Sequence, residues 1–234
     1  MIVDLRGHDK RNIAIVGDIH ADWASLNHMI NRAKPEIILQ VGDFGYWPDS
    51  YPLSNIKLGN CEIYFADGNH EHHDRLDDIR KSNNFVVHPG ITYMPRGSIM
   101  YLPNGSKCLF IGGAVSIDQH MRKEFINWFR QETISEIDIQ NLPDVDDIDI
   151  VISHTAPLEF DMKESIVFPD PSRKALSYVL DRYRPKLWFS GHYHYFLNGS
   201  YTHDDSKITN WYTLAELGKT RGWVWIDHRD KQSC

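Results

Sequence analysis

Seven side chains of metal-ligand type stand just beyond short apolar runs in this sequence. They are Asp18, His20, Asp43, Asn69, His154, His192 and His194. At the end of an extended strand, positions n and n+2 project to the same side, so each D-x-H or H-x-H pair can aim two donors at one place. Mixed imidazole and carboxylate donors suit Mn, Fe or Zn better than Ca or Mg. Seven donors exceed what one catalytic ion needs and suit two ions about 3.5–4 Å apart, with one bridging carboxylate.

The apolar runs before these residues predict the strands that must position them. They cover residues 12–16, 37–41, 62–66, 149–153 and 186–190. Near-continuous apolar runs of this length are typical of strands buried on both faces. Helical patterns separate some of them: Asp22 is placed as the N-cap of a stripe that reaches Ala33, and Asp170-Pro171 begins one that reaches Tyr183. Strands that alternate with helices indicate an α/β fold, in which ligands gather at the carboxyl ends of the strands.

Other segments predict further elements of a mixed sheet or a second sheet. Residues 133–136 resemble a capping box that opens a shorter helix. Residues 85–115 and 207–226 are each expected to form antiparallel strand pairs, with a turn at Pro103-Asn104-Gly105 in the first. The length of 234 residues suits a single domain over residues 1–234.

Composition narrows the classes of partner. The net charge of -7 provides no basic surface, so we expect no stable binding to nucleic acid and no membrane association through anionic lipid. No apolar run approaches the length of a membrane span, and the first residues have no signal-peptide pattern. The three cysteines are widely spaced and odd in number, which indicates reduced thiols. These features predict a cytoplasmic protein and leave its oligomeric state open.

The ligand candidates fall into five motifs, GDIH, GD, GNHE, SH and GHYH, in this order between residues 17 and 194. This series resembles the calcineurin-like metallophosphoesterase superfamily. The resemblance implies a four-layer sandwich, with helices around two mixed β-sheets. It also implies hydrolysis of phosphate monoesters or diesters at a centre of two divalent metal ions. We expect Mn or Fe, with Zn, Co or Ni as alternatives.

The resemblance also implies a role for each matching residue. One ion would be held by Asp18, His20 and His194. The other would be held by Asn69, His154 and His192, with Asp43 bridging the two. His70 would stand beside the metals as the catalytic group that protonates the leaving oxygen or stabilises the transition state, which an imidazole can do near neutral pH.

The segment GNHEHHD, residues 68–74, contains two more histidines and an acid. His72 and His73 match no motif, and we expect them to be solvated or to support the ligands without binding metal. Glu71 either orients His70 or a ligand, or is a surface acid.

The chain departs from the protein Ser/Thr phosphatases of this superfamily. Those enzymes carry an Arg after the second motif and another just before Gly-Asn-His, and both hold the substrate phosphate. Here GDFGYWPDS has no Arg, and Asp67 precedes Gly68. Arg122, after the Gly112-Gly113 turn, is the substitute candidate for substrate binding, since Arg suits bidentate phosphate contact. The alternative for Arg122 is a surface position on a following helix.

Phe44, Tyr46 and Trp47 follow Asp43 closely and either stack on a flat substrate group or pack over the core. With the missing arginines, they favour a phosphodiesterase that acts on a small or nucleotide-like substrate. The first alternative is a phosphomonoesterase or protein phosphatase. The second is a non-catalytic scaffold on the same fold, which the retention of all seven ligand types disfavours. A metallo-hydrolase acting on another bond is last, because the H-x-H-x-D-H pattern of β-lactamase-type enzymes is absent.

Overall fold

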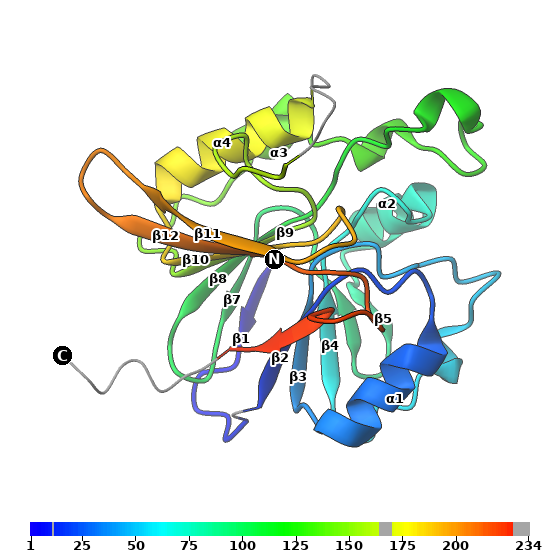
Figure 1. The fold of residues 1–234 in the computed structure, drawn as a ribbon. Helices are drawn as coiled ribbons and strands as arrows, with labels where there is room; N and C mark the ends of the chain where they lie inside the picture. The colour runs from blue at the N-terminus through cyan, green and yellow to red at the C-terminus, as the bar shows by residue number, and fades with distance from the viewer. Residues whose placement is uncertain (11, 164–169, 227–234) are drawn as a thin grey trace.

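The computed structural model describes residues 1–10, 12–163 and 170–226, so Cys234 lies outside the described residues. In these ranges, two mixed sheets form the centre of the fold (Figure 1). The seven-stranded sheet has the order β1 (Ile2–Asp4), β7 (Ser98–Tyr101), β8 (Lys107–Ile111), β9 (Ile150–Ser153), β10 (Leu187–Ser190), β12 (Ile208–Thr213) and β11 (Leu197–Thr202). The six-stranded sheet has the order β13 (Trp223–Trp225), β2 (Ile13–Val16), β3 (Ile37–Gln40), β4 (Glu62–Phe65), β6 (Ile91–Tyr93) and β5 (Val86–His88).

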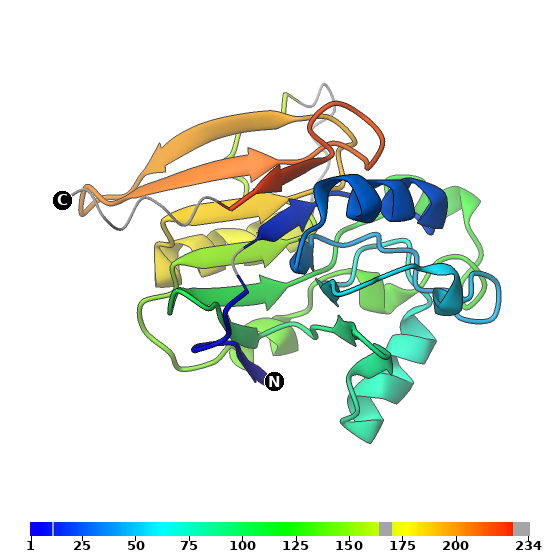
Figure 2. The same cartoon turned by 90° about the horizontal axis from the view of Figure 1, so that it is seen from below.

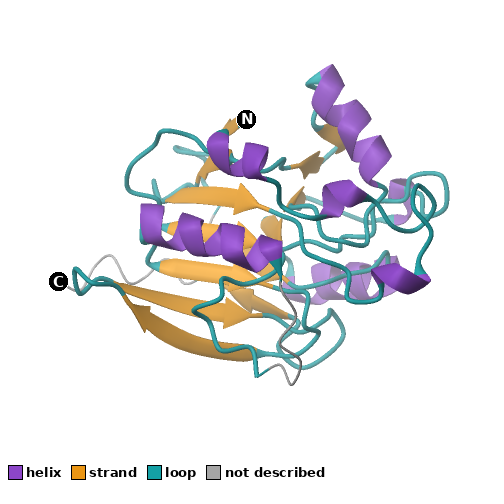
Figure 3. Ribbon diagram, turned by 90° about the horizontal axis from the view of Figure 1, so that it is seen from above, coloured by secondary structure: helices purple, strands orange, loops and turns teal. Residues whose placement is uncertain are grey.

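Helices lie outside the two sheets. They are α1 (Trp23–Ala33), α2 (His73–Ser82), α3 (Glu136–Gln140) and α4 (Pro171–Tyr183), with short 3-10 turns at Leu53–Asn55, Gln119–Met121 and Arg130–Glu132. Figure 2 shows α1 against the six-stranded sheet, and Figure 3 shows α4 across the face of the seven-stranded sheet. No helix in the described ranges has both the length and the apolar character needed to cross a bilayer.

Three apolar cores separate four layers. Successive residues of β2 face opposite ways, so Ala14 and Val16 pack in the core that contains α1, while Ile13 and Ile15 pack between the sheets. The third core packs Leu176 of α4 against the outer face of the seven-stranded sheet. The order is therefore helix, sheet, sheet, helix, and the predicted α/β sandwich of two mixed sheets is confirmed.

The strands nearest the predicted ligands run parallel. β2, β3 and β4 are parallel neighbours in one sheet, and β8, β9 and β10 are parallel neighbours in the other. Antiparallel strands β5, β13 and β11 close three of the four outer edges. All five strands predicted from the apolar runs are present, within one or two residues at their ends. Their carboxyl ends therefore gather the polar residues that follow them.

The helix starts follow the predicted caps, with one shift. Asp22 accepts a hydrogen bond from the backbone N–H of Ser25, and Asp170 caps α4 with Pro171 as its first residue. The capping box of α3 consists of Ser135 and Asp138, two residues beyond the predicted pair. Thr133 instead ends a 3-10 turn, and Ser135 directly precedes the helix, where its hydroxyl accepts the backbone N–H of Asp138.

One predicted strand pair is wrong. Within residues 207–226, β12 pairs antiparallel with β11, which begins at Leu197, while β13 joins the other sheet beside β2. Trp223–Trp225 thus supplies the edge of the six-stranded sheet instead of a hairpin partner. The other pair is confirmed: β7 and β8 are antiparallel, and Gly105 donates its N–H to the carbonyl of Leu102 in the turn.

Candidate metal centre

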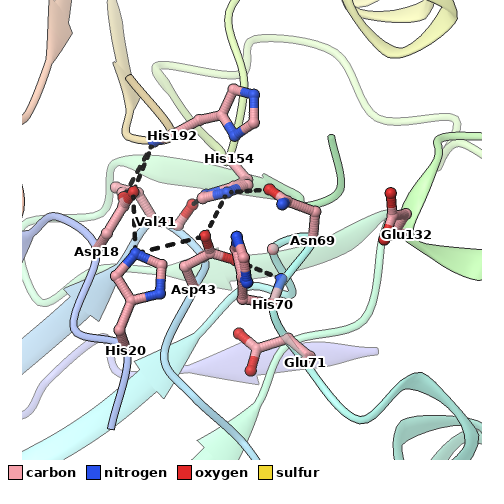
Figure 4. Close-up of polar contacts among 12 residues, drawn as sticks. Asp18, His20, Val41, Asp43, Asn69, His70, Glu71, Glu132, His154 and His192 are labelled. Atoms are coloured by element: carbon pink, nitrogen blue, oxygen red, sulfur yellow. Dashed lines mark hydrogen bonds and ion pairs between the residues drawn. The ribbon is translucent and has the colours of Figure 1, made fainter. Parts of the chain in front are cut away.

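The seven predicted ligands all follow the ends of neighbouring parallel strands. In the six-stranded sheet they follow β2 (Asp18 and His20), β3 (Asp43) and β4 (Asn69). In the seven-stranded sheet they follow β9 (His154) and β10 (His192 and His194). The carboxyl ends of both sheets thus meet at one place, where Figure 4 shows Asp18, His20, Asp43, Asn69, His154 and His192.

One group of donors is compact. Asp18, His20, Asp43 and His194 each offer an atom, and these atoms all lie within 4.8 Å of one another. Nε2 of His194 lies 3.1 Å from Nε2 of His20 and 3.1 Å from Oδ2 of Asp18. Oδ2 of Asp43 lies 3.7 Å from Nε2 of His20. Imidazole nitrogens and carboxylate oxygens aimed at one point are a donor set that fits a divalent transition metal.

The remaining predicted ligands lie on the other side of Asp43. Nε2 of His154 lies 3.3 Å from Oδ2 of Asp43 and 3.1 Å from Oδ1 of Asn69. The rings of His154 and His192 are 5.0 Å apart between centroids. The same oxygen of Asp43 therefore faces a histidine of each group, as a bridging ligand requires. The assignment of these residues to two ions stays a prediction.

Hydrogen bonds to neighbouring groups fix the orientation of His154 and Asn69. Nδ1 of His154 lies 3.2 Å from the carbonyl oxygen of Val41, so an N–H there donates to that carbonyl and leaves the Nε2 lone pair free. Nδ2 of Asn69 donates to Oγ of Ser116, which turns the amide oxygen towards His154. Ser116 in turn donates its backbone N–H to buried Glu132. Sequence reasoning did not identify Ser116 or Glu132, and no signal in one sequence distinguishes them from other loop residues.

Histidines are the charge partners of the buried carboxylates of Asp18 and Asp43 within the described part of the chain. Burial works against ionisation of Asp43, but the neighbouring His154 lowers its pKa well below the usual range. Burial also works against the imidazolium of His154, yet Asp43 raises the pKa of this histidine to about 9. In the absence of metal a proton thus takes the place of a cation between these two side chains, which fits a site built for positive charge.

Backbone strain marks the same residues. His20, Asp43, His192 and His194 have positive φ angles of 50°, 55°, 71° and 58°. Residues other than Gly rarely adopt this left-handed conformation, which costs on the order of 1–3 kcal/mol each and clusters at functional sites. The carbonyl oxygen of Asp43 accepts hydrogen bonds from the backbone N–H groups of Ile19 and His20, which helps to hold this conformation.

Two motif glycines provide space for ligands that come from elsewhere in the chain. A Cβ at Gly68 would lie closer than 3.0 Å to the Asp43 carboxylate and backbone. A Cβ at Gly191 would collide in the same way with the carboxylate of Asp18. Each glycine thus permits the close approach of a ligand from another motif.

The histidines of the GNHEHHD segment lie in different surroundings. His70 donates its backbone N–H to Oδ1 of Asp43, and its ring lies 5.1 Å from the ring of His20. Burial lowers the pKa of His70, against the opposing charge of Asp43. The ring of His72 packs against the rings of Trp47 and Phe129. Among the described residues, neither His72 nor His73 contacts a donor atom of the predicted metal ligands, so a supporting role fits both.

Glu71 is not a surface acid. It is fully buried and accepts the backbone N–H groups of Phe44, Gly45 and Tyr46 at 2.8, 3.0 and 2.6 Å. Burial raises the pKa of Glu71 to about 8, while these donors oppose the rise. The carboxyl group therefore holds the loop that follows Asp43 and fixes the position of that ligand. His73 is also buried and contacts the Gly68 carbonyl at 3.0 Å, so it is not solvated.

Arg122 lies at the site and not on an outer helix face. Its Nη1 and Nη2 lie 3.2 and 3.1 Å from Nδ1 and Nε2 of His70, and only 13% of its side chain is exposed. Asp118 holds the guanidinium through Nε at 2.8 Å. Arg122 and His70 both line a cavity of about 760 Å³ that also contains Asp43, Asn69, His192 and His194. The surface alternative for Arg122 is therefore wrong.

The aromatic run after Asp43 does not face this cavity. Phe44 and Tyr46 are buried in the core, where Phe44 stacks on Phe65 at 4.6 Å. Trp47 donates its indole N–H to the carbonyl of His70. Stacking of a substrate on Phe44 or Tyr46 is excluded because their rings are already covered. Among the described residues, the tyrosines that line the cavity are Tyr193 and Tyr195.

Comparison with known proteins agrees with this geometry. Residues 11–196 match the family model of the calcineurin-like phosphoesterases. A crystal structure of TT1561 from Thermus thermophilus is similar, with a TM-score of 0.57, 13% identity, and coverage of 89% of this chain and 90% of that one. A second crystal structure has a TM-score of 0.57 and 11% identity, over 93% of this chain and 95% of the other. At these identities the likeness concerns the fold alone. No curated protein matches.

The fold and the donor cluster define a metal-dependent phosphoesterase. The chain belongs to the calcineurin-like phosphoesterase family, as the motifs predicted.

Proposed function

We propose that this phosphoesterase hydrolyses a small phosphodiester, using water and a pair of divalent metal ions. The proposal rests on the number of positively charged side chains that line the cavity. Among the described residues that line it, the basic side chains other than histidine are Arg122 and Lys163, and Asp118 and Asp170 line it as well. A monoester carries about one more negative charge than a diester, and this arrangement offers no second arginine for it. The charge balance therefore supports a singly charged diester.

The chain's own residues divide the work as follows. Bound divalent metal lowers the pKa of water and offsets charge on the phosphoryl oxygens. Arg122 contacts a phosphoryl oxygen through its guanidinium, which Asp118 holds in place. His70, beside Arg122 and Asp43, gives a proton to the leaving oxygen. Glu71 keeps Asp43 in position through the loop that it binds.

Two ions, Mn or Fe, are the proposed metal content, with Zn, Co or Ni as alternatives. The support is the donor set of imidazoles, two buried carboxylates and one amide, which is too rich in nitrogen for Ca or Mg. The position of Asp43 between two groups of donors supports a count of two.

The test compares kcat/KM for bis(4-nitrophenyl) phosphate and 4-nitrophenyl phosphate, with the same metal and pH. We expect preference for the diester. In Arg122→Ala, turnover of both substrates should fall, and Arg122→Lys should recover only part of it, because an ammonium cannot make a bidentate contact. Preference for the monoester, together with dephosphorylation of a phosphopeptide, would overturn the diester proposal and favour a phosphatase.

We also propose a cytoplasmic location and no stable nucleic-acid partner. The net charge of -7 supports the second point. The thiols of Cys61 and Cys108 are free and buried, and burial raises the pKa of Cys61 to about 12, which suits unreactive cysteines in a reducing compartment. Fractionation of cells that produce the tagged chain tests the location, and recovery in a membrane or secreted fraction contradicts it.

A further inference from the structure

The cavity beside the ligands has apolar lining residues that the chemistry at phosphorus does not use. Val115, Ile117, Tyr193 and Tyr195 line it, opposite in character to the ligands and Arg122 that line the rest. Its volume of about 760 Å³ lies within the range of about 300–1,000 Å³ typical of small-ligand sites. A bare phosphate group would leave most of this space empty.

The two tyrosines present rings instead of hydroxyl groups. The hydroxyl of Tyr193 is hydrogen-bonded to Oγ1 of buried Thr155 at 2.9 Å, and the hydroxyl of Tyr195 donates to the carbonyl of Met162. Their ring centroids are 6.0 Å apart, and the ring of Tyr193 meets the ring of His192 edge to face at 5.2 Å. Because protein partners already engage both hydroxyls, the ring carbons are what a ligand in the cavity meets.

Ile117 supplies an apolar surface on the same cavity. Its side chain is 77% exposed, although Ile usually avoids water, and it lies five residues before Arg122 in the chain. The neighbouring exposed residues Met121, Phe125 and Ile126 are not among the described residues that line the cavity. Among the described residues, the apolar lining next to the metal ligands thus consists of four side chains, two of them aromatic rings, which suits a flat group.

We propose that the apolar lining of this cavity, Val115, Ile117, Tyr193 and Tyr195, binds a flat aromatic substituent of the phosphate ester, such as an aryl group or a nucleobase. The assignment rests on the proposed function and names its substrate class. The phosphate end of the ligand meets Arg122 and His70, and the ring end packs on Tyr195 and Ile117. Any base can stack on an aromatic side chain, so the site selects flat groups more than a particular base.

Binding and turnover test the proposal separately. Isothermal titration calorimetry on Mn-loaded protein compares phenylphosphonate, methylphosphonate and octylphosphonate, which have the same charge and no ester bond to cleave. We expect phenylphosphonate to bind roughly tenfold tighter than methylphosphonate, near the lower end of what one aromatic stack provides. Tyr195→Ala and Ile117→Ala should each reduce this preference several-fold. Tyr195→Phe should keep it, because the ring remains. Tyr178→Ala, which removes an exposed tyrosine of α4 outside the cavity, is the matched control.

Kinetics use two diesters with the same leaving group, bis(4-nitrophenyl) phosphate and methyl 4-nitrophenyl phosphate. The ratio of their kcat/KM values should exceed the ratio of their hydrolysis rates in solution about tenfold and fall towards that solution ratio in Tyr195→Ala. Equal binding of phenyl and methyl phosphonates overturns the aromatic site even if diesters are hydrolysed. Tighter binding of octylphosphonate that depends on Ile117 overturns it in favour of an alkyl site. An aryl preference in binding without hydrolysis of either diester would leave the site standing and reject the diesterase function.

Discussion

Gly191, from the last motif, lies so close to Asp18, from the first, that a methyl group on its Cα would overlap the carboxylate. We expect Gly191→Ala to displace Asp18 and to lower metal content by at least half, with a larger loss of activity. Elemental analysis of the purified protein measures the metal. Gly59→Ala is the control, since nothing lies within 4 Å of a Cβ there and its cost is only that of a positive φ. Full metal content in Gly191→Ala would show that the close approach is not required.

Asp43→Ala should affect both groups of donors at once. Oδ2 of Asp43 faces His20 at 3.7 Å and His154 at 3.3 Å, so its loss removes a donor from each. We expect metal content to fall below one ion per chain. His194→Ala, which touches only the first group, should lose about one ion. Two ions retained in Asp43→Ala would contradict the bridging role.

His70→Ala should bind metal nearly normally, while kcat falls by roughly 10²–10⁴, the usual range for a lost acid–base group. The loss should shrink for diesters with good leaving groups, which need little protonation. His28→Ala, at an exposed position on α1, is the control. A rate loss of the same size for every leaving group would argue that His70 acts on the phosphoryl group instead of protonating the leaving oxygen.

Ser116→Ala should weaken metal binding without touching any ligand. Oγ of Ser116 accepts from the amide of Asn69 and so keeps its oxygen towards His154. Loss of such an outer contact typically costs about 10–100-fold in metal affinity. Titration of metal-free protein with Mn²⁺ measures it, with exposed Ser200→Ala as control. Unchanged affinity would show that the amide orientation does not depend on the serine.

We expect the folded protein to lose stability in mild acid because of His73. Burial lowers its pKa to about 4, below the ordinary value near 6.5, so the unfolded chain binds a proton that the folded chain refuses. Above pH 6.5 the contribution of His73 to the free energy of unfolding is complete. It declines as the pH falls towards 4, by roughly 3 kcal/mol in total, at about 1.4 kcal/mol per pH unit. Urea unfolding of metal-free protein at pH 7 and pH 4.5 measures it. His73→Gln should lose less stability over this range, and an equal loss would assign the effect to other groups.

Sequence alone identified the candidate ligands and the strands behind them. Each of the five apolar runs has the period and length of a buried strand, and each ends at a Gly, Asp or His that the fold brings to one place. The order of the motifs between residues 17 and 194 then predicted the family, whose model matches residues 11–196. These signals are local: a strand pattern and the residue that follows it can be read within one short stretch of chain.

Tertiary structure decided what depends on contacts between distant segments. Whether Arg122 faces solvent or His70, 52 residues away, follows from how the segment after β8 packs, and no local pattern encodes that. The same holds for Glu71, whose three partners lie on the Asp43 loop, and for β13, which joins β2 instead of β12. Phe44 and Tyr193 are both aromatic neighbours of a metal ligand in sequence, yet one lies in the core and the other lines the cavity. Side-chain direction at a strand end depends on backbone angles that the surrounding packing imposes, including the positive φ of Asp43 and His192, and these are settled only when the two sheets meet.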